Sequence, residues 1–475
     1  MDTIYSPDDL TDKGPKYKGV VALIRDQIAR ERLRVGDKLP PVRELAWQLK
    51  ITPGTVARAY TVLIDSGVLK AEVGRGTYVA PGQGEVQSDV TKKPLLIEVD
   101  AIAHDTSHQP GPVNLYSPHL PNGGQVALIR RLLAEIAQEP PSGVMHYPSR
   151  RGSRAAREAM LHWLQGSPTG AVEADEIVLT HGGQNATLLV LQTVLRGRKP
   201  AIFVEELAYP GFRRAAELLR ADIVPVAMDQ NGVIPEALAD AAVRHPEGQI
   251  LCTSPEVHSP TCVLTPTERR RSIVAVARQH DLHLMEDDCY RMGHAEGPGY
   301  RQLAPERGWY ISSISKSITP ALRLGCAIGP RGMSAALHRA AEHGFFGLAT
   351  PLSDLAAAVL RHPDLPDIMA RTRLSVEQYV KVAVNTLGAF DLRWRKDVPF
   401  LWLVLPPGWR ASAFCLAAEQ RGVQIRPAED FACRDAQTPH AVRMAINGGI
   451  SLQRFETAME QLRDLLSNPP EQISV

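Results

Sequence analysis

A lysine in the second half of the chain stands among residues that could hold an anion beside it. Lys316 follows Ser313 and Ser315 in the stretch SSISKSITPALRLG, and Arg323 comes seven positions later. Hydroxyl groups and a guanidinium can bind a phosphate, which leaves the lysine amine available as a nucleophile toward a carbonyl carbon. The stretch therefore predicts amine chemistry next to an anion site.

Two further stretches supply groups that this chemistry needs. LTHGGQNA places Gly183 and Gln184 where a helical pattern begins, and backbone N–H groups at a helix start can bind an anion. EDDCY sets two carboxylates side by side, which repel each other unless one of them meets a cation or a proton. No histidine is spaced to complete a metal site, so we expect no metal. An anion nest, a carboxylate and a lysine amine together match the needs of pyridoxal 5′-phosphate.

These residues need a framework, and the sequence beyond about residue 113 predicts one. Short apolar runs alternate with helical stretches: EIVLT, AIFVEE, IVPVAM, QILCTS, LHLMEDD, YISSIS and RLGCAIG. Such alternation is typical of an α/β body, in which a mostly parallel sheet is covered by helices on both faces. Ligands of such bodies bind at the carboxyl ends of the strands. Because the residues named above follow these runs directly, we expect them to meet at one edge of the sheet.

The first eighty residues differ from the rest in charge. Residues 16–80 carry twelve Lys and Arg against six Asp and Glu, although the net charge of all 475 residues is only +1. A basic module on a mildly acidic body points to nucleic acid as a partner of the first part only. The six cysteines are scattered without a CxxC pair, which favours reduced thiols. No apolar run is long enough to cross a membrane, and the acidic N-terminus does not look like a signal peptide, so we expect a cytoplasmic protein.

Within this basic part the apolar spacing predicts three helices and a hairpin. The expected elements are helices from about Tyr17 to Arg32, from about Val42 to Leu49 and from Pro53 to Gly67, and strands at Val68–Ala71 and Thr77–Ala80. Thr52 can cap the third helix. Three helices followed by a hairpin form the winged helix-turn-helix plan.

The same segment is similar to a known family. GDKLPPVRELA, TVARAYTVLIDSGVL and GRGTYV resemble the DNA-binding domain of GntR-type bacterial regulators. The resemblance implies contacts with double-stranded operator DNA from five positions: Arg43, Thr52, Thr55, Arg58 and Arg75. Arginines suit phosphates or guanine edges, and threonines at a helix start suit phosphates. We expect this domain to occupy residues 1–80 and a polar linker to occupy residues 81–112.

The body resembles a fold-type I aminotransferase over about residues 113–466, on the motifs SxSKxxxPxLRxG and EDDxY. The resemblance implies a large sheet domain at 113–350 and a smaller α+β domain at 351–475. It assigns Lys316 to the Schiff base, Asp287 to the pyridine nitrogen and Tyr290 to the phenolic oxygen of the cofactor. Asp288 is the alternative to Asp287, but the D-x-x-Y spacing favours Asp287.

The resemblance also assigns residues around the cofactor and the effector. The phosphate cradle comprises Gly183, Gln184, Ser313, Ser315 and Arg323. Tyr209 would stack on the cofactor ring, Arg443 would bind the acid group of a ligand, and Tyr147 would reach the phosphate of a neighbouring subunit in a homodimer. In TSPEVHSPTCV, either His258 or Ser259 would replace the usual amide near the phenolic oxygen, and Cys262 stands in place of a turn glycine.

A winged helix, a linker and an aminotransferase-like body in this order resemble the MocR subfamily of GntR regulators. The resemblance implies a regulator that binds pyridoxal 5′-phosphate and senses a small amine or amino acid by aldimine exchange at Lys316. Two alternatives stay open. The body could be an active aminotransferase with an auxiliary DNA-binding domain, or the regulator could sense pyridoxal 5′-phosphate itself.

Overall fold

The computed structural model describes residues 16–30, 32–66, 68–72, 76–80, 111–138, 141, 145–433, 436 and 438–469. The chain divides into two compact units, one within Met1–Ile102 and the other within Ala103–Val475. No helix in these described ranges combines the length and the apolar character that a membrane span needs.

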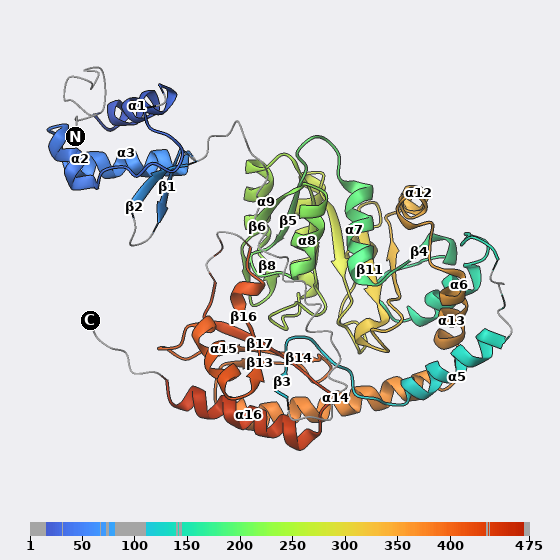
Figure 1. Ribbon diagram of the computed structural model, residues 1–475. Coiled ribbons are helices and arrows are strands. Elements are labelled where there is room, and N and C mark those ends of the chain that lie inside the picture. Colours follow the sequence, from blue (N-terminus) through green and yellow to red (C-terminus); the bar gives the residue numbers. More distant parts are fainter. Residues whose placement is uncertain are drawn as a thin grey trace. The chain divides into compact units, whose positions relative to one another are not determined.

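The first unit has the predicted three helices and hairpin (Figure 1). Its elements are α1 (Lys16–Ala29), α2 (Val42–Gln48), α3 (Pro53–Asp65), β1 (Leu69–Glu72) and β2 (Gly76–Val79). The two strands pair antiparallel, with Leu69 opposite Val79. Apolar residues from all three helices and both strands share one core, which includes Ile24, Leu45 and Leu63.

The first helix ends three residues earlier than predicted. Helix α1 ends at Ala29, whereas the apolar spacing predicted a helix to Arg32. The N–H groups of Arg32 and Leu33 both donate to the carbonyl of Gln27, and Leu33 turns its side chain into the core, where it is 6% exposed. Burial of Leu33 therefore takes the chain out of the helix before Arg32.

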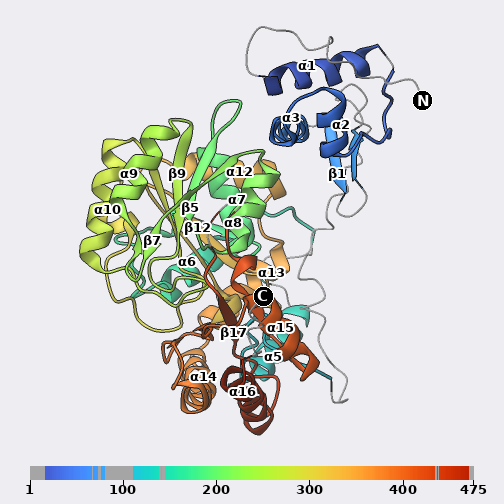
Figure 2. The ribbon, with the colours of Figure 1, turned by 90° about the vertical axis from the view of Figure 1, so that its left-hand side faces the viewer.

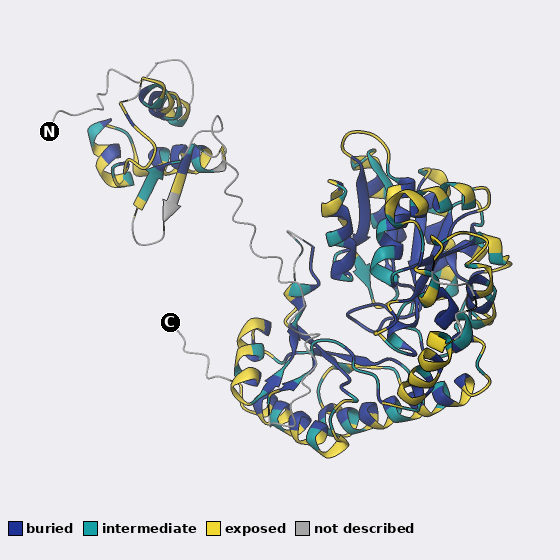
Figure 3. Ribbon diagram, turned by 45° about the vertical axis from the view of Figure 1, so that its right-hand side comes forward, coloured by how far each residue is buried: buried dark blue, intermediate teal, exposed yellow. Residues whose placement is uncertain are grey.

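The second unit is built on a mostly parallel sheet, as predicted, and this sheet has seven strands. Across the sheet the strands are β4 (Ile177–Thr180), β12 (Gly325–Ile328), β11 (Gly308–Ser313), β10 (His283–Asp287), β9 (Gly248–Thr253), β5 (Ala201–Glu205) and β6 (Asp222–Val226). Strand β12 runs antiparallel to both of its neighbours, and the other pairs along β11, β10, β9, β5 and β6 are parallel. The strands are the most deeply buried part of this unit (Figure 3).

Helices cover both faces of the sheet (Figure 2). One face packs against α7 (Gly183–Val194), α8 (Pro210–Leu218) and α12 (Ser334–Phe345). The other face packs against α9 (Pro235–Arg244), α10 (Thr267–Gln279), α11 (Tyr300–Leu303), α5 (Gln125–Gln138), α6 (Arg154–Trp163) and α13 (Thr350–Leu360). A short hairpin of β7 (Met228–Asp229) and β8 (Gly232–Val233) follows β6.

The C-terminal elements form a second, smaller core. A four-stranded antiparallel sheet has the order β13 (Leu392–Arg393), β14 (Phe400–Val404), β17 (Ala441–Ala445) and β16 (Arg426–Pro427). Helices α14 (Leu365–Leu387), α15 (Ala411–Gln420) and α16 (Leu452–Ser467) pack with it. Strand β3 (Val113–Asn114) pairs with β15 (Val423–Gln424) and joins this core, whereas α13 packs with the large sheet. The division at residue 350 stays a prediction.

Candidate functional site

A cavity opens at the carboxyl edge of the large sheet, and we call it the lysine pocket. It is lined by Gly183, Gln184, Tyr209, Asp287, Cys289, Tyr290, Ser313, Ser315, Lys316 and Arg323. Nine of these ten residues were singled out from the sequence, and they come from segments far apart in the chain. Cys289 was missed, although its position between Asp287 and Tyr290 in the EDDCY stretch was a usable signal.

Lys316 owes its position to a change of structure at the end of β11. The strand ends at Ser313, and residues Ile314–Lys316 form a single 3-10 turn, η3, which turns the half-buried lysine into the pocket. The Oγ atom of Ser313 accepts a hydrogen bond from the N–H of Ser315 at 3.2 Å and donates to the carbonyl of Leu324 at 3.0 Å. The Lys316 Nζ atom lies 5.9 Å from the centre of the Tyr290 ring.

The anion end of the pocket depends on close backbone approach. Gly182, just before α7, has φ of +81°, and a Cβ atom there would lie 3.2 Å from the guanidinium of Arg323. A Cβ atom on Gly183 would lie 2.5 Å from Cys289 Sγ, which is a clash. Two glycines therefore leave room at the start of α7, where N–H groups point outward and favour negative charge. The Ser315 hydroxyl and the Arg323 guanidinium add donors, so this end fits a phosphate group.

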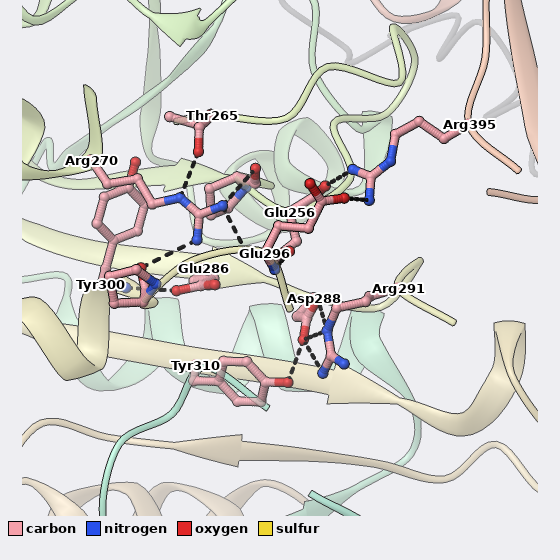
Figure 4. A network of polar contacts seen from close by, with 12 residues as sticks. Glu256, Thr265, Arg270, Glu286, Asp288, Arg291, Glu296, Tyr300, Tyr310 and Arg395 are labelled. Carbon is pink, nitrogen blue, oxygen red and sulfur yellow. Dashed lines mark hydrogen bonds and ion pairs between the residues drawn. The ribbon is translucent and has the colours of Figure 1, made fainter. Parts of the chain in front are cut away.

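The two adjacent carboxylates point to different surroundings. Asp287 lines the pocket and is 7% exposed; its Oδ1 atom accepts from the Cys289 N–H at 3.0 Å. Burial raises the pKa of Asp287 to about 6. Asp288 points away, with Oδ2 2.7 Å from the Arg291 guanidinium and 2.6 Å from the Tyr310 hydroxyl (Figure 4). Arg291 is thus the cation that the paired carboxylates require, and it pairs with Asp288. The Asp287 carboxylate faces the pocket instead.

Three more acids, Glu205, Glu256 and Glu286, are buried in this unit, and the sequence did not predict them. Glu256 and Arg270 are almost fully buried and form an ion pair at 2.7 Å (Figure 4). Glu286 accepts from the Tyr300 N–H at 2.7 Å, and burial raises its pKa to about 8. Glu205, at the end of β5, bonds to the Thr253 hydroxyl, and burial raises its pKa to about 7. Burial therefore brings the pKa values of two of these acids, Glu205 and Glu286, close to neutral.

Arg443 lies on β17 and is not among the described residues that line the lysine pocket. It is 2% exposed; one NH group donates to Ser259 Oγ at 3.3 Å and another donates to the carbonyl of Tyr116. The guanidinium also lies 4.7 Å from the centre of the Phe431 ring. Two predicted residues 184 positions apart, Ser259 and Arg443, are thus in contact.

The two candidates for the missing amide, His258 and Ser259, are both buried and have different partners, since Ser259 contacts Arg443. His258 Nδ1 lies 2.7 Å from Thr261 Oγ1, and burial lowers the pKa of His258 to about 4, so the ring is neutral at pH 7. Among the described residues that line the lysine pocket, neither His258 nor Ser259 occurs. Cys262 has φ of +62°, the left-handed conformation that favours glycine, as its place in a glycine turn predicted.

Tyr147 stays outside the lysine pocket of its own chain. Its side chain is 88% exposed and lines a surface hollow with His146, Pro148, Leu348 and Thr350. The predicted contact of Tyr147 with a neighbouring subunit stays a prediction.

Four of the five predicted DNA-contacting residues are described, and Arg75 lies outside the described residues. Arg43 and Thr52 are exposed on α2 and just before α3. Thr52 does not cap α3 with its side chain, because its hydroxyl pairs with the Thr55 hydroxyl at 2.9 Å instead. Arg58 stacks over the Tyr17 ring, 4.3 Å from its centre. The predicted cap was wrong, because the Thr55 hydroxyl takes the place of a main-chain N–H group as the partner of the Thr52 side chain.

Comparison with known families explains this two-part arrangement. Residues 112–462 match the model of aminotransferase class I and II. The chain belongs to the aminotransferase class I and II family. Residues 16–79 match the bacterial regulatory proteins of the gntR family. This combination is that of MocR-type regulators, as predicted from the sequence, and the family implies pyridoxal 5′-phosphate as its cofactor.

The chain is also similar to individual proteins. The chain is 27% identical over 462 residues to an uncharacterised HTH-type transcriptional regulator, YdeF, of Bacillus subtilis, covering 96% of this chain and 95% of the relative. It is 32% identical over 314 residues to the HTH-type pyridoxine biosynthesis transcriptional regulator PdxR of Corynebacterium glutamicum, covering 65% and 64%. The Pyrococcus horikoshii kynurenine aminotransferase has the same fold as the body, with a TM-score of 0.68, 21% identity and coverage of 81% and 98%.

Proposed function

We propose that this MocR-type regulator binds operator DNA through residues 1–80 and senses a small amine or amino acid at Lys316. The observation that carries the proposal is the convergence of a lysine, a buried carboxylate and an anion nest on one pocket. Residues 81–112 would act as the linker, and residues 113–350 and 351–475 as the two domains of the sensing body.

The pocket residues fit the cofactor of this family. The N–H groups at Gly183 and Gln184, the hydroxyls of Ser313 and Ser315 and the guanidinium of Arg323 would hold its phosphate. Asp287 would hold a proton on the pyridine nitrogen, and Tyr209 would pack against the ring face. Tyr290 and either His258 or Ser259 would lie toward the phenolic oxygen. When bound, pyridoxal 5′-phosphate supplies an aldehyde carbon that an amine can join reversibly and an electron-withdrawing ring.

The remaining residues would recognise the effector. Lys316 Nζ would form the resting C=N bond, and the effector amine would take its place, with Lys316 released as a free amine. The buried guanidinium of Arg443 would bind a carboxylate or sulfonate on the same molecule. Binding to one conformation only would shift the protein toward it and so change how a homodimer holds its two DNA-binding domains. Tyr147 would reach the phosphate of the neighbouring subunit.

The DNA side of the proposal rests on exposed residues of the helix-turn-helix. Arg43 and Thr52 are exposed, and Thr55 and Arg58 lie on α3, the helix that enters the major groove in this plan. Arg75 would contact the backbone from the hairpin. Replacing Arg43 by Ala should weaken binding to a fragment from upstream of the protein's own gene and lower its salt dependence; an unchanged salt slope would remove Arg43 from the interface.

One experiment tests sensing directly. The cofactor-loaded full-length protein is titrated with a panel of amines and amino acids, and cofactor absorbance and affinity for the same DNA fragment are followed together. An amine that changes both supports the proposal. An amine that changes the absorbance and leaves DNA affinity unaltered would show binding without regulation.

Two other functions have specific support. Asp287 and Lys316 share one pocket, which also suits an active aminotransferase, and turnover of an amino donor with a keto acid would favour that function. Relatives named as regulators of pyridoxine biosynthesis and vitamin B6 salvage favour the cofactor itself as the signal. A change of DNA affinity on adding pyridoxal 5′-phosphate alone would favour this second alternative.

A further inference from the structure

A short segment of the C-terminal core is attached directly to the wall of the lysine pocket. We call residues 430–433 the strap. The Ala208 N–H donates to the carbonyl of Phe431 at 2.9 Å, and the Cys433 N–H donates to the carbonyl of Glu206 at 2.9 Å. Leu207 and Ala432 face each other in an antiparallel bridge. The strap therefore extends the end of β5 just before Tyr209, which lines the pocket.

Arg213 fixes the strap from the first turns of α8. Its guanidinium donates to the carbonyl of Ala432 at 2.5 Å and to the carbonyl of Asp430 at 2.6 Å. These two carbonyls flank Phe431, so one rigid side chain determines the backbone on both sides of that ring. A planar guanidinium holds two acceptors at once, which a lysine ammonium on a flexible stem does not reproduce.

Phe431 connects the strap to Arg443. The ring is fully buried, and the guanidinium groups of Arg443 and Arg426 lie 4.7 Å and 4.8 Å from its centre. The two arginines are opposite each other on β17 and β16, and Arg426 is neutralised by Asp430 at 3.0 Å. The face of an aromatic ring attracts a cation and favours one orientation of it. Phe431 therefore helps to aim the Arg443 guanidinium, which Ser259 contacts from the other side.

We propose that Arg213 is a positioning residue for the acid group of the effector, acting through the strap and Phe431 on Arg443. This inference rests on the function proposed above. Arg213 holds the main-chain carbonyls on both sides of Phe431, and Phe431 orients Arg443. Arg213 would therefore influence the selectivity of the site for amines that carry a carboxylate or sulfonate. Helix α8, which carries Arg213, begins directly after Tyr209 of the lysine pocket. The same helix would therefore link the position of Arg443 to the position of Tyr209.

The test compares two amines that differ in one carboxylate. Cofactor-loaded full-length protein is titrated with L-alanine and with ethylamine, and the half-saturation concentration of each is read from cofactor absorbance. The ratio of the two values isolates recognition of the acid group, because any change in cofactor binding affects both titrations. The variants are Arg213→Lys, Phe431→Leu and the double variant, with Arg214→Lys as control. Arg214 makes no hydrogen bond or ion pair with the described part of the chain.

Wild-type protein should prefer L-alanine, and Arg213→Lys should reduce this preference about tenfold, as loss of a charge-assisted hydrogen-bond pair would. Phe431→Leu should have a similar effect, and the double variant should lose no more than the larger single change, because both act on one path. Arg214→Lys should keep the wild-type ratio.

If wild-type protein prefers L-alanine and Arg213→Lys prefers it equally, the inference is overturned and the proposed function stands. If wild-type protein shows no preference, recognition of an acid by Arg443 is wrong, and the inference fails with it.

Discussion

The two ends of the pocket region are built in different ways. The proposed cofactor end comprises Gly183, Asp287, Ser313 and Lys316, which line the lysine pocket, each within a few residues of the end of a strand. The proposed effector end comprises Ser259 from the large domain together with Phe431 and Arg443 from the C-terminal core, and both Ser259 and Phe431 contact the Arg443 guanidinium. The cofactor end is thus fixed by one sheet edge, whereas the effector end depends on contacts between two cores. If the proposed function holds, we expect that cofactor binding and effector selectivity can be altered separately.

The largest effect should come from Lys316→Ala, which removes the amine at the cofactor end. We expect complete loss of covalent attachment of pyridoxal 5′-phosphate and no absorbance change with any amine, because no other described lysine lines the pocket. Mass spectrometry after borohydride reduction measures the attachment. Lys381→Ala, on the distant helix α14, serves as the control. An adduct that survives in Lys316→Ala would place the chemistry elsewhere.

The buried acid Glu205 should make the cofactor-free protein less stable as the pH rises. Its folded pKa of about 7 lies above the reference value of 4.5, so the folded state binds the proton more tightly. The stabilising contribution is complete below pH 4.5 and is lost as the pH passes through about 7, at a total of about 3 kcal/mol. Glu205→Gln should flatten the dependence of the free energy of unfolding on pH in this range. Its half-buried neighbour Glu206 provides the control, and equal pH profiles for Glu205→Gln and wild type would contradict the assignment.

The two adjacent aspartates should respond in opposite ways to the same substitution. Asp287→Asn should weaken cofactor binding about 30-fold, or about 2 kcal/mol, because the partner of the pyridine nitrogen is lost. Asp288→Asn should leave Arg291 buried without its carboxylate and lower stability rather than cofactor affinity. Fluorescence titration with cofactor and denaturant unfolding measure the two quantities. If Asp288→Asn instead weakened cofactor binding and Asp287→Asn lowered stability, Asp288 would be the partner of the pyridine nitrogen.

At the effector end, Arg443→Lys should lower the affinity for amines that carry an acid group about tenfold and leave the affinity for the cofactor nearly unchanged. The reason is that a lysine ammonium cannot make the bidentate pair of a guanidinium. Titration with L-alanine and, separately, with the cofactor distinguishes the two ends. A parallel loss of cofactor affinity would show that the ends are not separable.

The same division explains which features the sequence could predict. Residues of the cofactor end follow apolar runs in short motifs, so their meeting at a sheet edge follows from the α/β pattern. Arg213 and Phe431 carry no such signal, because their contacts are to main-chain carbonyls and to rings brought close only by tertiary packing. The choice between Asp287 and Asp288 rested on spacing alone, and Arg291 supplies the physical reason for their different surroundings.

Errors in the first unit have a similar origin. The end of α1 and the cap at Thr52 depend on Leu33 and Thr55, whose competing burial and hydrogen bonding are invisible to a helical pattern. The network of Glu256, Arg270 and Glu286 escaped for the same reason, since its members are far apart in sequence.

The most direct test of the account is the identity of the residue that carries the cofactor. Full-length protein is incubated with pyridoxal 5′-phosphate, reduced with borohydride, digested and analysed by mass spectrometry. We expect one phosphopyridoxyl group on the peptide that contains Lys316. A peptide that stays unlabelled, or a label on another lysine, would contradict it.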